Sequence, residues 1–324
     1  MNNAPIIIDA HTIAEKVAAA VSQLASKMRP DFLAGLEAAQ TTEQTERGRE
    51  VLAQLVKNAR MASTESLPLC QDTGYVWVFL EFAGPVAVRG DIFSEVDAAV
   101  AEVYQQRGLR MSMVRDALCD RSNSGDNTPA FCELYVTSAS EQPAKWPGEK
   151  PGDERPTNAQ PAEQPDEGEA TSDTTGARAQ ARLHVMLKGG GSDNASALAM
   201  LPPSAGRQGV VDFVLAAVRD KGASACPPLL VGVGVGTTFD KVGALAKRAL
   251  LRKVGSINAN PEAAALEAEL LIALNDTGIG PGGLGGTTTA LAVHVNTAPC
   301  HIAALPVAVN LGCCALRSIS IDML

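Results

Sequence analysis

Apolar residues spaced three or four positions apart predict helices over most of the first 60 residues and again after residue 91. Thr12 and Glu15 have the spacing of a capping box at the start of the first helix. A second helix is expected over Thr45 to Met61, and Asp91 can cap a third. The apolar positions that define these three helices are Ile13, Val17, Val21, Leu24 and Met28, then Val51, Leu52, Leu55 and Val56, then Ile92, Val96, Val100 and Val103.

Runs of β-branched and aromatic residues predict strands between and after these helices. In the first half of the chain they are 75–82, 131–136 and 182–187. In the second half, strands at "PLLVGVGVG", 287–295 and 302–309 alternate with the helical stretches "GVVDFVLAAVRDKG", "FDKVGALAKRALLRKVG" and "NPEAAALEAELLIALNDTG". The pattern predicts an α/β protein in which a helical N-terminal segment packs on a mixed α/β body, as one continuous domain over residues 1–324.

A polar segment over residues 139–180 interrupts this pattern. It carries nine acidic and four basic side chains, and six prolines lie between residues 137 and 180. Such a segment buries too little apolar surface to offset its chain entropy, so we expect a disordered acidic insertion loop. Because it separates the strand-like runs 131–136 and 182–187, a long hairpin loop is the simplest interpretation, with a domain boundary as the alternative.

The composition is that of a globular protein, because 46% of the 324 residues are hydrophobic and can build a large core. No apolar run approaches the length of a membrane span, and the N-terminus lacks the basic start and cleavage site of a secretory signal. We therefore expect a cytoplasmic protein. A net charge of −9 gives no electrostatic reason to expect binding to nucleic acid or to an anionic membrane.

Seven cysteines are spread along the chain. An odd number without a secretory signal argues against a disulfide framework and for free thiols in a reducing compartment. Most such cysteines are inert core residues. Cys70, Cys226 and Cys313 differ because each lies at the end of a predicted element, where a metal ligand can be presented. Three widely spaced thiolates suit an iron–sulfur cluster in which one iron has no protein ligand and can act as a Lewis acid.

Four glycine-rich stretches can approach a ligand with their backbone N–H groups or can form ordinary turns. They are "CQDTG" at 70, "NSGDNTPA" at 123, "KGGGSDN" at 188 and "GIGPGGLGGTTT" at 278. A fifth, "GVGVGTT" at 232, resembles a dinucleotide fingerprint, but its third glycine has the wrong spacing and no acidic residue ends a second strand about 20 residues later. We interpret it as a tight strand-to-helix turn.

Seven motifs in a fixed order carry a family resemblance. They are "CQDTG", "LR" about 40 residues later, "NSGDNTPA", "KGGGSDN", "ACPPLLVGVGVGTT", "TGIGPGGLGG" and "HIAALPVAVNLGC". Together they cover nearly the whole chain except the acidic insertion, and they resemble the α subunit, or N-terminal half, of class I iron–sulfur fumarate hydratases. The related L-tartrate dehydratase α subunit shares several of them, but the forms "KGGGSDN" and "SGDNTPA" favour the fumarate hydratase.

The resemblance implies a set of site residues. Cys70, Cys226 and Cys313 match the three ligands of a 4Fe–4S cluster, and the spacing from His301 favours Cys313 over the adjacent Cys314. Arg110 is then expected to clamp one substrate carboxylate bidentately, while His301 and Asp72 exchange protons or orient the hydroxyl. The full set that matches contacts to the dicarboxylate is Gln71, Asp72, Arg110, Gly191 and His301.

Each of these side chains also has a purely structural interpretation. Arg110 is then a solvated arginine at a helix end, His301 is a structural histidine at the start of a strand, and Asp72 is an Asx-turn residue. Lys188 precedes three glycines and could pair with the substrate or with a carboxylate of the chain, so its role is open.

The resemblance also implies partners. Family members pair this portion with a second domain or chain that provides the catalytic base, so we expect a β subunit of the same hydro-lyase and a dimer of αβ units. The leading hypothesis is the cluster-bearing α subunit of a hydro-lyase that reversibly hydrates fumarate to (S)-malate. The alternatives are an L-tartrate dehydratase α subunit, an iron–sulfur redox sensor or binding protein without turnover, and a metal-free scaffold with core cysteines.

Overall fold

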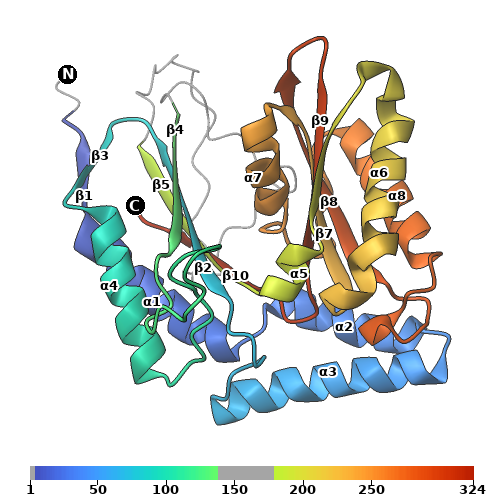
Figure 1. The fold of residues 1–324 in the computed structure, drawn as a ribbon, viewed down its shortest axis with the longest axis horizontal. Coiled ribbons are helices and arrows are strands. Elements are labelled where there is room, and N and C mark those ends of the chain that lie inside the picture. The colour runs from blue at the N-terminus through green and yellow to red at the C-terminus, as the bar shows by residue number, and fades with distance from the viewer. Residues whose placement is uncertain (1–3, 138–178) are drawn as a thin grey trace, which may run out of the picture.

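The computed structural model describes residues 4–137 and 179–324 of the chain (Figure 1). The predicted insertion over 139–180 lies outside the described residues, apart from its last two positions. Before it, the elements are β1 (Ile6–Asp9), α1 (Ala10–Ser26), α2 (Pro30–Thr42), α3 (Glu46–Glu65), β2 (Tyr75–Ala83), β3 (Val86–Arg89), α4 (Ile92–Gln106) and β4 (Phe131–Thr137). After it, they are β5 (Gln180–Lys188), α5 (Gly190–Asn194), β6 (Ala197–Leu201), α6 (Gly206–Lys221), β7 (Leu229–Thr237), α7 (Phe239–Ala249), α8 (Pro261–Asn275), β8 (Ala290–Cys300), β9 (Leu305–Gly312) and β10 (Arg317–Asp322).

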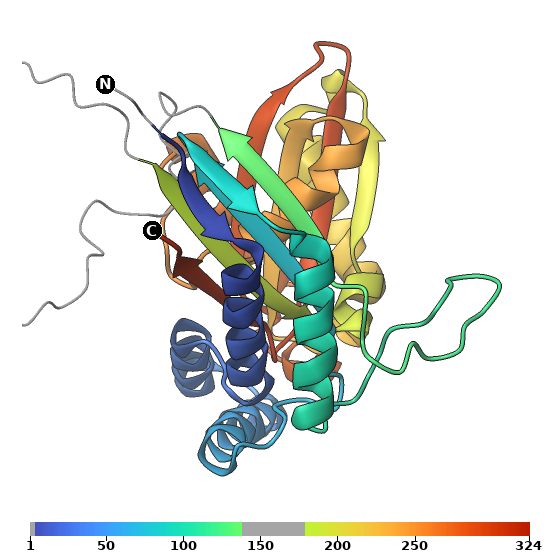
Figure 2. The ribbon, with the colours of Figure 1, turned by 90° about the vertical axis from the view of Figure 1, so that its left-hand side faces the viewer.

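Two four-stranded sheets form the body of the protein. The strand orders are β10–β5–β2–β4 in the first sheet and β6–β9–β7–β8 in the second, while β1 and β3 pair separately. Figures 1 and 2 show α1 and α4 on the outer face of the first sheet, α6 and α8 on the outer face of the second, and α7 between the two sheets. Helices α2 and α3 lie across the bottom of both sheets in Figure 1. The predicted α/β class is confirmed. Among the described residues, no helix combines the length and apolar character needed to cross a bilayer.

The two strands that flank the insertion do not form the predicted hairpin. β4 pairs with β2 in parallel, and β5 pairs with β2 antiparallel from the other side, so β2 separates them. β2 takes this central place because it is buried along nearly its whole length, on both of its faces. β4, by contrast, is partly exposed along its length, as an edge strand is.

The helices begin where side chains can cap them. Asp91 accepts hydrogen bonds from the first turn of α4, as predicted. Thr45 accepts one from the first turn of α3, so it caps that helix and is not its first residue. The predicted capping box at Thr12 is wrong, because α1 begins earlier and is capped by Asp9, which accepts a bond from the His11 backbone N at 3.1 Å. β1 runs directly into this helix, so Thr12 lies inside its first turn.

Apolar side chains form one large cluster in each half of the molecule and a third between the halves. The first lies between α1, α4 and the first sheet, and the second lies between α6, α8 and the second sheet. The two sheets share the third cluster, so they have a common core. It consists of Phe32, Leu36, Ala39, Leu52, Val56, Trp77, Phe79, Met186, Leu230, Leu250, Ala292 and Leu316.

The glycines of "GVGVGTT" allow α7 to pack tightly on β7. A Cβ at Gly232 would lie 2.3 Å from the Ala246 carbonyl oxygen, and a Cβ at Gly234 would lie 2.7 Å from that of Val242. Any larger residue would push the helix away from the strand. These glycines therefore allow close packing between β7 and α7, in agreement with the interpretation of "GVGVGTT" as a tight strand-to-helix turn.

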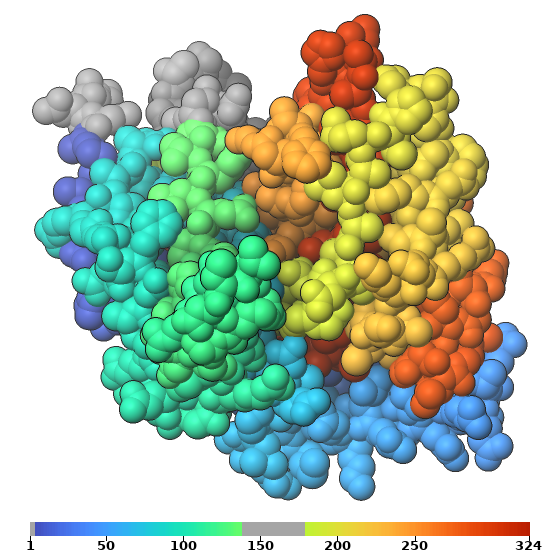
Figure 3. Space-filling model, viewed as in Figure 1, coloured from blue at the N-terminus to red at the C-terminus, as the bar shows by residue number. Residues whose placement is uncertain are grey.

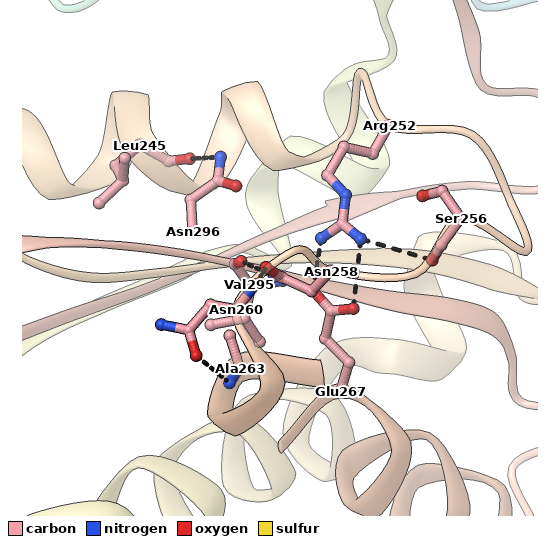
Figure 4. Close-up of polar contacts among 9 residues, drawn as sticks. All are labelled: Leu245, Arg252, Ser256, Asn258, Asn260, Ala263, Glu267, Val295 and Asn296. Carbon is pink, nitrogen blue, oxygen red and sulfur yellow. Dashed lines mark hydrogen bonds and ion pairs between the residues drawn. The ribbon is translucent and has the colours of Figure 1, made fainter. Parts of the chain in front are cut away.

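A buried ion pair fastens the segment after α7 to α8 and β8 (Figure 4). The Arg252 guanidinium contacts the Glu267 carboxylate, and the two side chains are 4% and 9% exposed. Oε1 of Glu267 also accepts bonds from Asn258 Nδ2 at 2.8 Å and from the Val295 backbone N at 2.7 Å. The carboxylate is thus compensated by one cation and by neutral donors from two other segments.

Glu43 joins the turn between α2 and α3 to the glycine-rich stretch that precedes β8. Its carboxylate accepts backbone bonds of 3.0 Å from Thr45 and from Thr287. Burial alone would raise the pKa of Glu43, but these bonds outweigh burial and lower the pKa from 4.5 to about 2. A group whose pKa is lower in the folded state stabilises the fold above its unfolded-state pKa and loses that contribution as the pH falls through its folded-state value.

Glu43→Gln is therefore expected to lower the free energy of unfolding by about 2–3 kcal/mol at pH 7 and by a smaller amount at pH 3. Urea unfolding of the wild type and the variant at both pH values measures the two differences. Glu50→Gln is the matched control because Glu50 is exposed on α3, and it should change the free energy by less than about 0.5 kcal/mol. An effect of Glu43→Gln that grew on acidification would contradict this role.

Candidate active site

Cys70, Cys226 and Cys313 lie at the ends of elements, as predicted. Cys70 precedes β2, Cys226 precedes β7, and Cys313 follows β9 directly. The Cys314 backbone N donates to the Cys226 carbonyl oxygen at 2.9 Å, which brings two of these segments together. Cys70 and Cys313 pack against one small apolar cluster that includes Ala62 of α3. The three segments therefore meet beside the C-terminal part of α3.

The thiols of these segments also act on one another electrostatically. Burial raises the pKa of Cys226, and negative charge on Cys313 and Cys70 raises it further. Burial raises the pKa of Cys314 as well, and the same three cysteines add to the effect. Because charge interactions weaken with distance, these effects place the four thiols in one neighbourhood.

The remaining cysteines lie apart from this neighbourhood. Cys119 is exposed in the long loop before β4, and Cys300 is exposed at the end of β8. Cys132 lies on β4, where burial and then the negative charge of Asp97 raise the pKa of its thiol to about 12. Their different surroundings make Cys119 and Cys132 suitable controls for experiments on the other thiols.

The three candidate ligands supply the thiolate donors that an iron–sulfur cluster uses. Within 4–137 and 179–324, no three His, Cys, Asp or Glu side chains are close enough together to hold one ion. The thiolates of an iron–sulfur cluster bind different iron atoms, so they are spaced more widely than the ligands of one ion. Cys70, Cys226 and Cys313 have the donor chemistry and the shared neighbourhood that such a cluster requires.

Asp72 connects "CQDTG" to "KGGGSDN". Its Oδ1 accepts a bond from the Gly74 backbone N at 2.9 Å, which is the geometry of an Asx turn. Its Oδ2 accepts a bond from the Gly190 backbone N, also at 2.9 Å. The second bond holds the glycine turn that opens α5 against the loop of Cys70, so Asp72 does more than form a local turn.

Gly74 lets the same two segments approach closely. It has a φ of +80°, and a Cβ there would lie 2.8 Å from the Lys188 carbonyl oxygen. β2 and β5 pair at this point, with Tyr75 opposite Lys188. Only glycine combines this backbone conformation with this contact.

Lys188 is buried and paired inside the chain, which answers the question that its sequence left open. Its side chain is 1% exposed, and Nζ donates to Ser192 Oγ at 2.8 Å and lies 3.4 Å from Asp193 Oδ1. Burial lowers the pKa of Lys188, while the nearby negative charges of Asp193 and Cys313 oppose that shift. The partner of Lys188 is therefore a carboxylate of the protein, and its cation lies near one of the candidate thiols.

Asp193 extends this pairing toward the second sheet. The Tyr75 hydroxyl donates to Asp193 Oδ2 at 3.0 Å, and Lys247 Nζ of α7 donates to the Tyr75 hydroxyl at 2.8 Å. Asn310 of β9 donates to Asp193 Oδ1 at 3.3 Å. This polar network links the two halves of the molecule, between which the surface is hollowed in Figure 3. Tyr75 and Lys247 belong to no motif, and nothing in "KGGGSDN" pairs its Asp193 with them, because only tertiary packing brings the three together.

Gln71, Arg110 and Gly191 lie around the loop of Cys70. Gln71 and Gly191 are exposed, and a Cβ on Gly191 would lie 3.6 Å from the Ser224 carbonyl oxygen, in the segment that leads to Cys226. The Arg110 side chain is exposed, and its backbone carbonyl accepts a bond from the Thr73 hydroxyl. The structure thus brings these three residues to the same region as Asp72 and the thiols.

His301 lies elsewhere. It is exposed in the connection between β8 and β9, where its Nδ1 accepts a bond from the Ala303 backbone N at 3.1 Å. The eight residues of β9 separate it from Cys313, a span of roughly 25 Å along the strand. Figure 1 shows this connection at the end of the second sheet that is remote from α3. The described chain does not bring His301 to the thiols.

Comparison with known proteins places this geometry in context. The family model described as fumarate hydratase (Fumerase) matches residues 14–144 and 170–322. A protein of Methanocaldococcus jannaschii with the provisional name L(+)-tartrate dehydratase subunit alpha is 33% identical over 291 residues, which is 89% of each chain. The L(+)-tartrate dehydratase subunits alpha of Escherichia coli K12 and Shigella sonnei are each 30% identical over 305 residues, which is 94% of this chain and 88% of theirs.

The chain belongs to the fumarate hydratase family. It is accordingly an enzyme, a hydro-lyase of the iron–sulfur type. All candidate site residues lie within the parts that match the family. The internal stretch that the family model does not match, 145–169, falls within the predicted insertion, so this part of it is an addition to the family pattern.

Proposed function

We propose that this chain is the α-type subunit of a hydro-lyase that interconverts fumarate and (S)-malate, and that Cys70, Cys226 and Cys313 hold a 4Fe–4S cluster. The observation that carries the proposal is the meeting of three thiol-bearing segments beside Asp72 and the glycine turn at Gly190. When bound, the iron without a protein ligand would supply a Lewis acid that polarises the carbon–oxygen bond of the substrate hydroxyl.

The residues around the thiols have complementary tasks in this proposal. The exposed Arg110 clamps the carboxylate remote from the cluster, because a guanidinium can hold a carboxylate with two parallel bonds. Gln71 and the backbone N–H of Gly191 supply neutral donors to the same dianion. Each Asp72 oxygen accepts one N–H bond and keeps a lone pair that can accept a bond from the substrate hydroxyl. Asp72 is thus held in place to orient the hydroxyl or take up its proton.

In this proposal, His301 can take part in catalysis only after several chains have assembled. Because β9 separates it from Cys313, we propose that it contributes to a site formed with another chain of a dimer of αβ units. A β subunit is proposed because the relatives in E. coli and Shigella sonnei are named as alpha subunits. A reducing compartment such as the cytoplasm is proposed because an oxygen-sensitive cluster and free thiols both need one.

L-tartrate is the second candidate substrate. Relatives 30–33% identical to this chain carry the name L(+)-tartrate dehydratase subunit alpha. Loss of water from tartrate yields oxaloacetate by the same type of elimination from a hydroxy-dicarboxylate, so the same donors would serve it. Substrate choice then depends on contacts to one additional hydroxyl group.

Anaerobic co-expression of this chain with its β subunit tests the function. Fumarate consumption with malate formation is expected, and the chain without the β subunit should be inactive or nearly so. Oxaloacetate formation from L-tartrate without fumarate turnover would shift the assignment to tartrate dehydration. A cluster-bearing complex without turnover of either substrate would instead support a redox sensor or binding protein.

A further inference from the structure

Arg317 is a buried arginine that has no carboxylate partner in the described part of the chain. It begins β10, four residues after Cys313, and its side chain is 1% exposed. Its Nη2 donates to the Asp72 carbonyl oxygen at 2.7 Å. Within 4–137 and 179–324, its Nε and Nη1 are buried and have no hydrogen-bond partner.

The other buried arginines of the described chain are compensated. Arg29 pairs with Asp31 and also donates to the carbonyl oxygens of Leu250 and Arg252. Arg252 pairs with Glu267. A buried cation costs much free energy unless a negative group offsets it, so the surroundings of Arg317 imply an anion that the described residues do not provide.

The position of Arg317 identifies where that anion belongs. Its bond to Asp72 reaches the loop two residues past Cys70. Along the chain, Arg317 directly follows the turn that contains Cys313, in which the Leu316 backbone N donates to the Cys313 carbonyl oxygen at 3.0 Å. The guanidinium therefore connects two of the three thiol-bearing segments.

Tyr104 lies near Arg317 and contacts the same loop. Its hydroxyl donates to the Gly74 carbonyl oxygen at 2.9 Å, within the same loop. Burial raises the pKa of Tyr104 to about 12, and the charge of Arg317 acts in the opposite direction. Arg317 is thus close enough to the "CQDTG" loop to influence a second buried group there.

We propose that Arg317 is a positioning residue for the cluster: it fastens the loop of Cys70 to the turn of Cys313, and it supplies positive charge and N–H donors to the anionic group that the thiols hold. This inference rests on the proposed three-cysteine cluster. A cluster bound by three thiolates carries net negative charge, and hydrogen bonds to its sulfur atoms favour the reduced form.

Arg317→Met, Arg317→Lys and the control Arg107→Met test this role in the reconstituted full chain. Arg107 is exposed and lies near the same loop, where its Nη2 is 3.5 Å from the Ser66 carbonyl oxygen. The measurements are iron and sulfide content, the midpoint potential by EPR-monitored titration, and the rate of cluster loss to a chelator. Arg317→Met is expected to bind the cluster and to lower the reduced-to-oxidised ratio at a fixed potential about tenfold, which is about 59 mV for one electron.

Arg317→Lys should have a midpoint potential close to that of the wild type, because lysine keeps the positive charge. It should lose the cluster to the chelator faster than the wild type, because an ammonium group cannot replace the forked guanidinium. Arg107→Met should match the wild type in every measurement. A wild-type chain that binds no cluster would defeat the proposed function, whereas an Arg317→Met chain with unchanged potential and unchanged cluster loss would defeat only this role. If Arg317→Met does not fold, the proposal is tested with Arg317→Lys alone. A rate of cluster loss in Arg317→Lys equal to that of the wild type would then overturn it.

Discussion

Single replacement of Cys70, Cys226 or Cys313 by serine is expected to remove the brown colour of the anaerobically reconstituted chain and nearly all of its iron, about four atoms per chain. The reason is geometric, since each thiol comes from a different segment and no other cysteine is placed to substitute for it except Cys314. Iron and sulfide determination with a visible spectrum measures the effect. In the complex with the β subunit, loss of hydro-lyase activity should accompany loss of iron.

Cys119→Ser and Cys132→Ser are the controls for this experiment. Cys119 is exposed in the loop before β4, and Cys132 lies on that strand, so both variants should keep the full iron content. Cys314→Ser should also keep it. Equal loss of iron in the controls would undo the ligand assignment, and retention of iron by Cys313→Ser together with its loss in Cys314→Ser would transfer the third ligand to the neighbouring position.

Glu267→Ala is expected to destabilise the protein by about 3–5 kcal/mol, because it leaves the buried Arg252 without its counter-charge. It also removes the acceptor for Asn258 and for the Val295 backbone N. Urea unfolding measures the change. The expected loss is a large part of the stability of a typical domain, so partial unfolding at 37 °C is a further expected outcome.

Glu269→Ala provides the matched control two positions later on α8. Glu269 also pairs with an arginine, Arg207, but the two side chains are 42% and 50% exposed. An exposed pair contributes about 0–1 kcal/mol, so this variant should remain close to the wild type. Similar losses for the two variants would show that burial does not distinguish these ion pairs.

The sequence predicted the long elements well because their signals are local. α4 begins after Asp91 and β7 covers the apolar glycine-containing run, as expected. It did not reveal β1, β3, β6 or β10, since strands of four to six residues are defined by the partners they find in the folded chain. The prediction of a hairpin was wrong for the same reason. The strands on either side of the insertion, β4 and β5, are neighbours along the sequence pattern, but in the fold β2 lies between them.

The candidate site likewise contains residues that the sequence predicted and residues that it did not. The motifs pointed to Cys70, Cys226 and Cys313 through their places at element ends, and the structure brings their segments together. The structure places His301 before β9 and Cys313 after it, at opposite ends of the strand. The spacing of 12 residues between them along the chain could not reveal this separation. Arg317 carried no signal at all, because an arginine among strand residues gives no indication of burial until its neighbours are known.

The apolar cluster shared by the two sheets has a consequence for how this chain can be divided. Side chains from α2, from β2 and β5, and from β7 and β8 all contribute to it. A cut between the halves would expose this surface on both fragments, so neither fragment can be expected to persist as an independent folding unit. Splitting the gene between the two sheets is therefore expected to yield two fragments that do not fold alone.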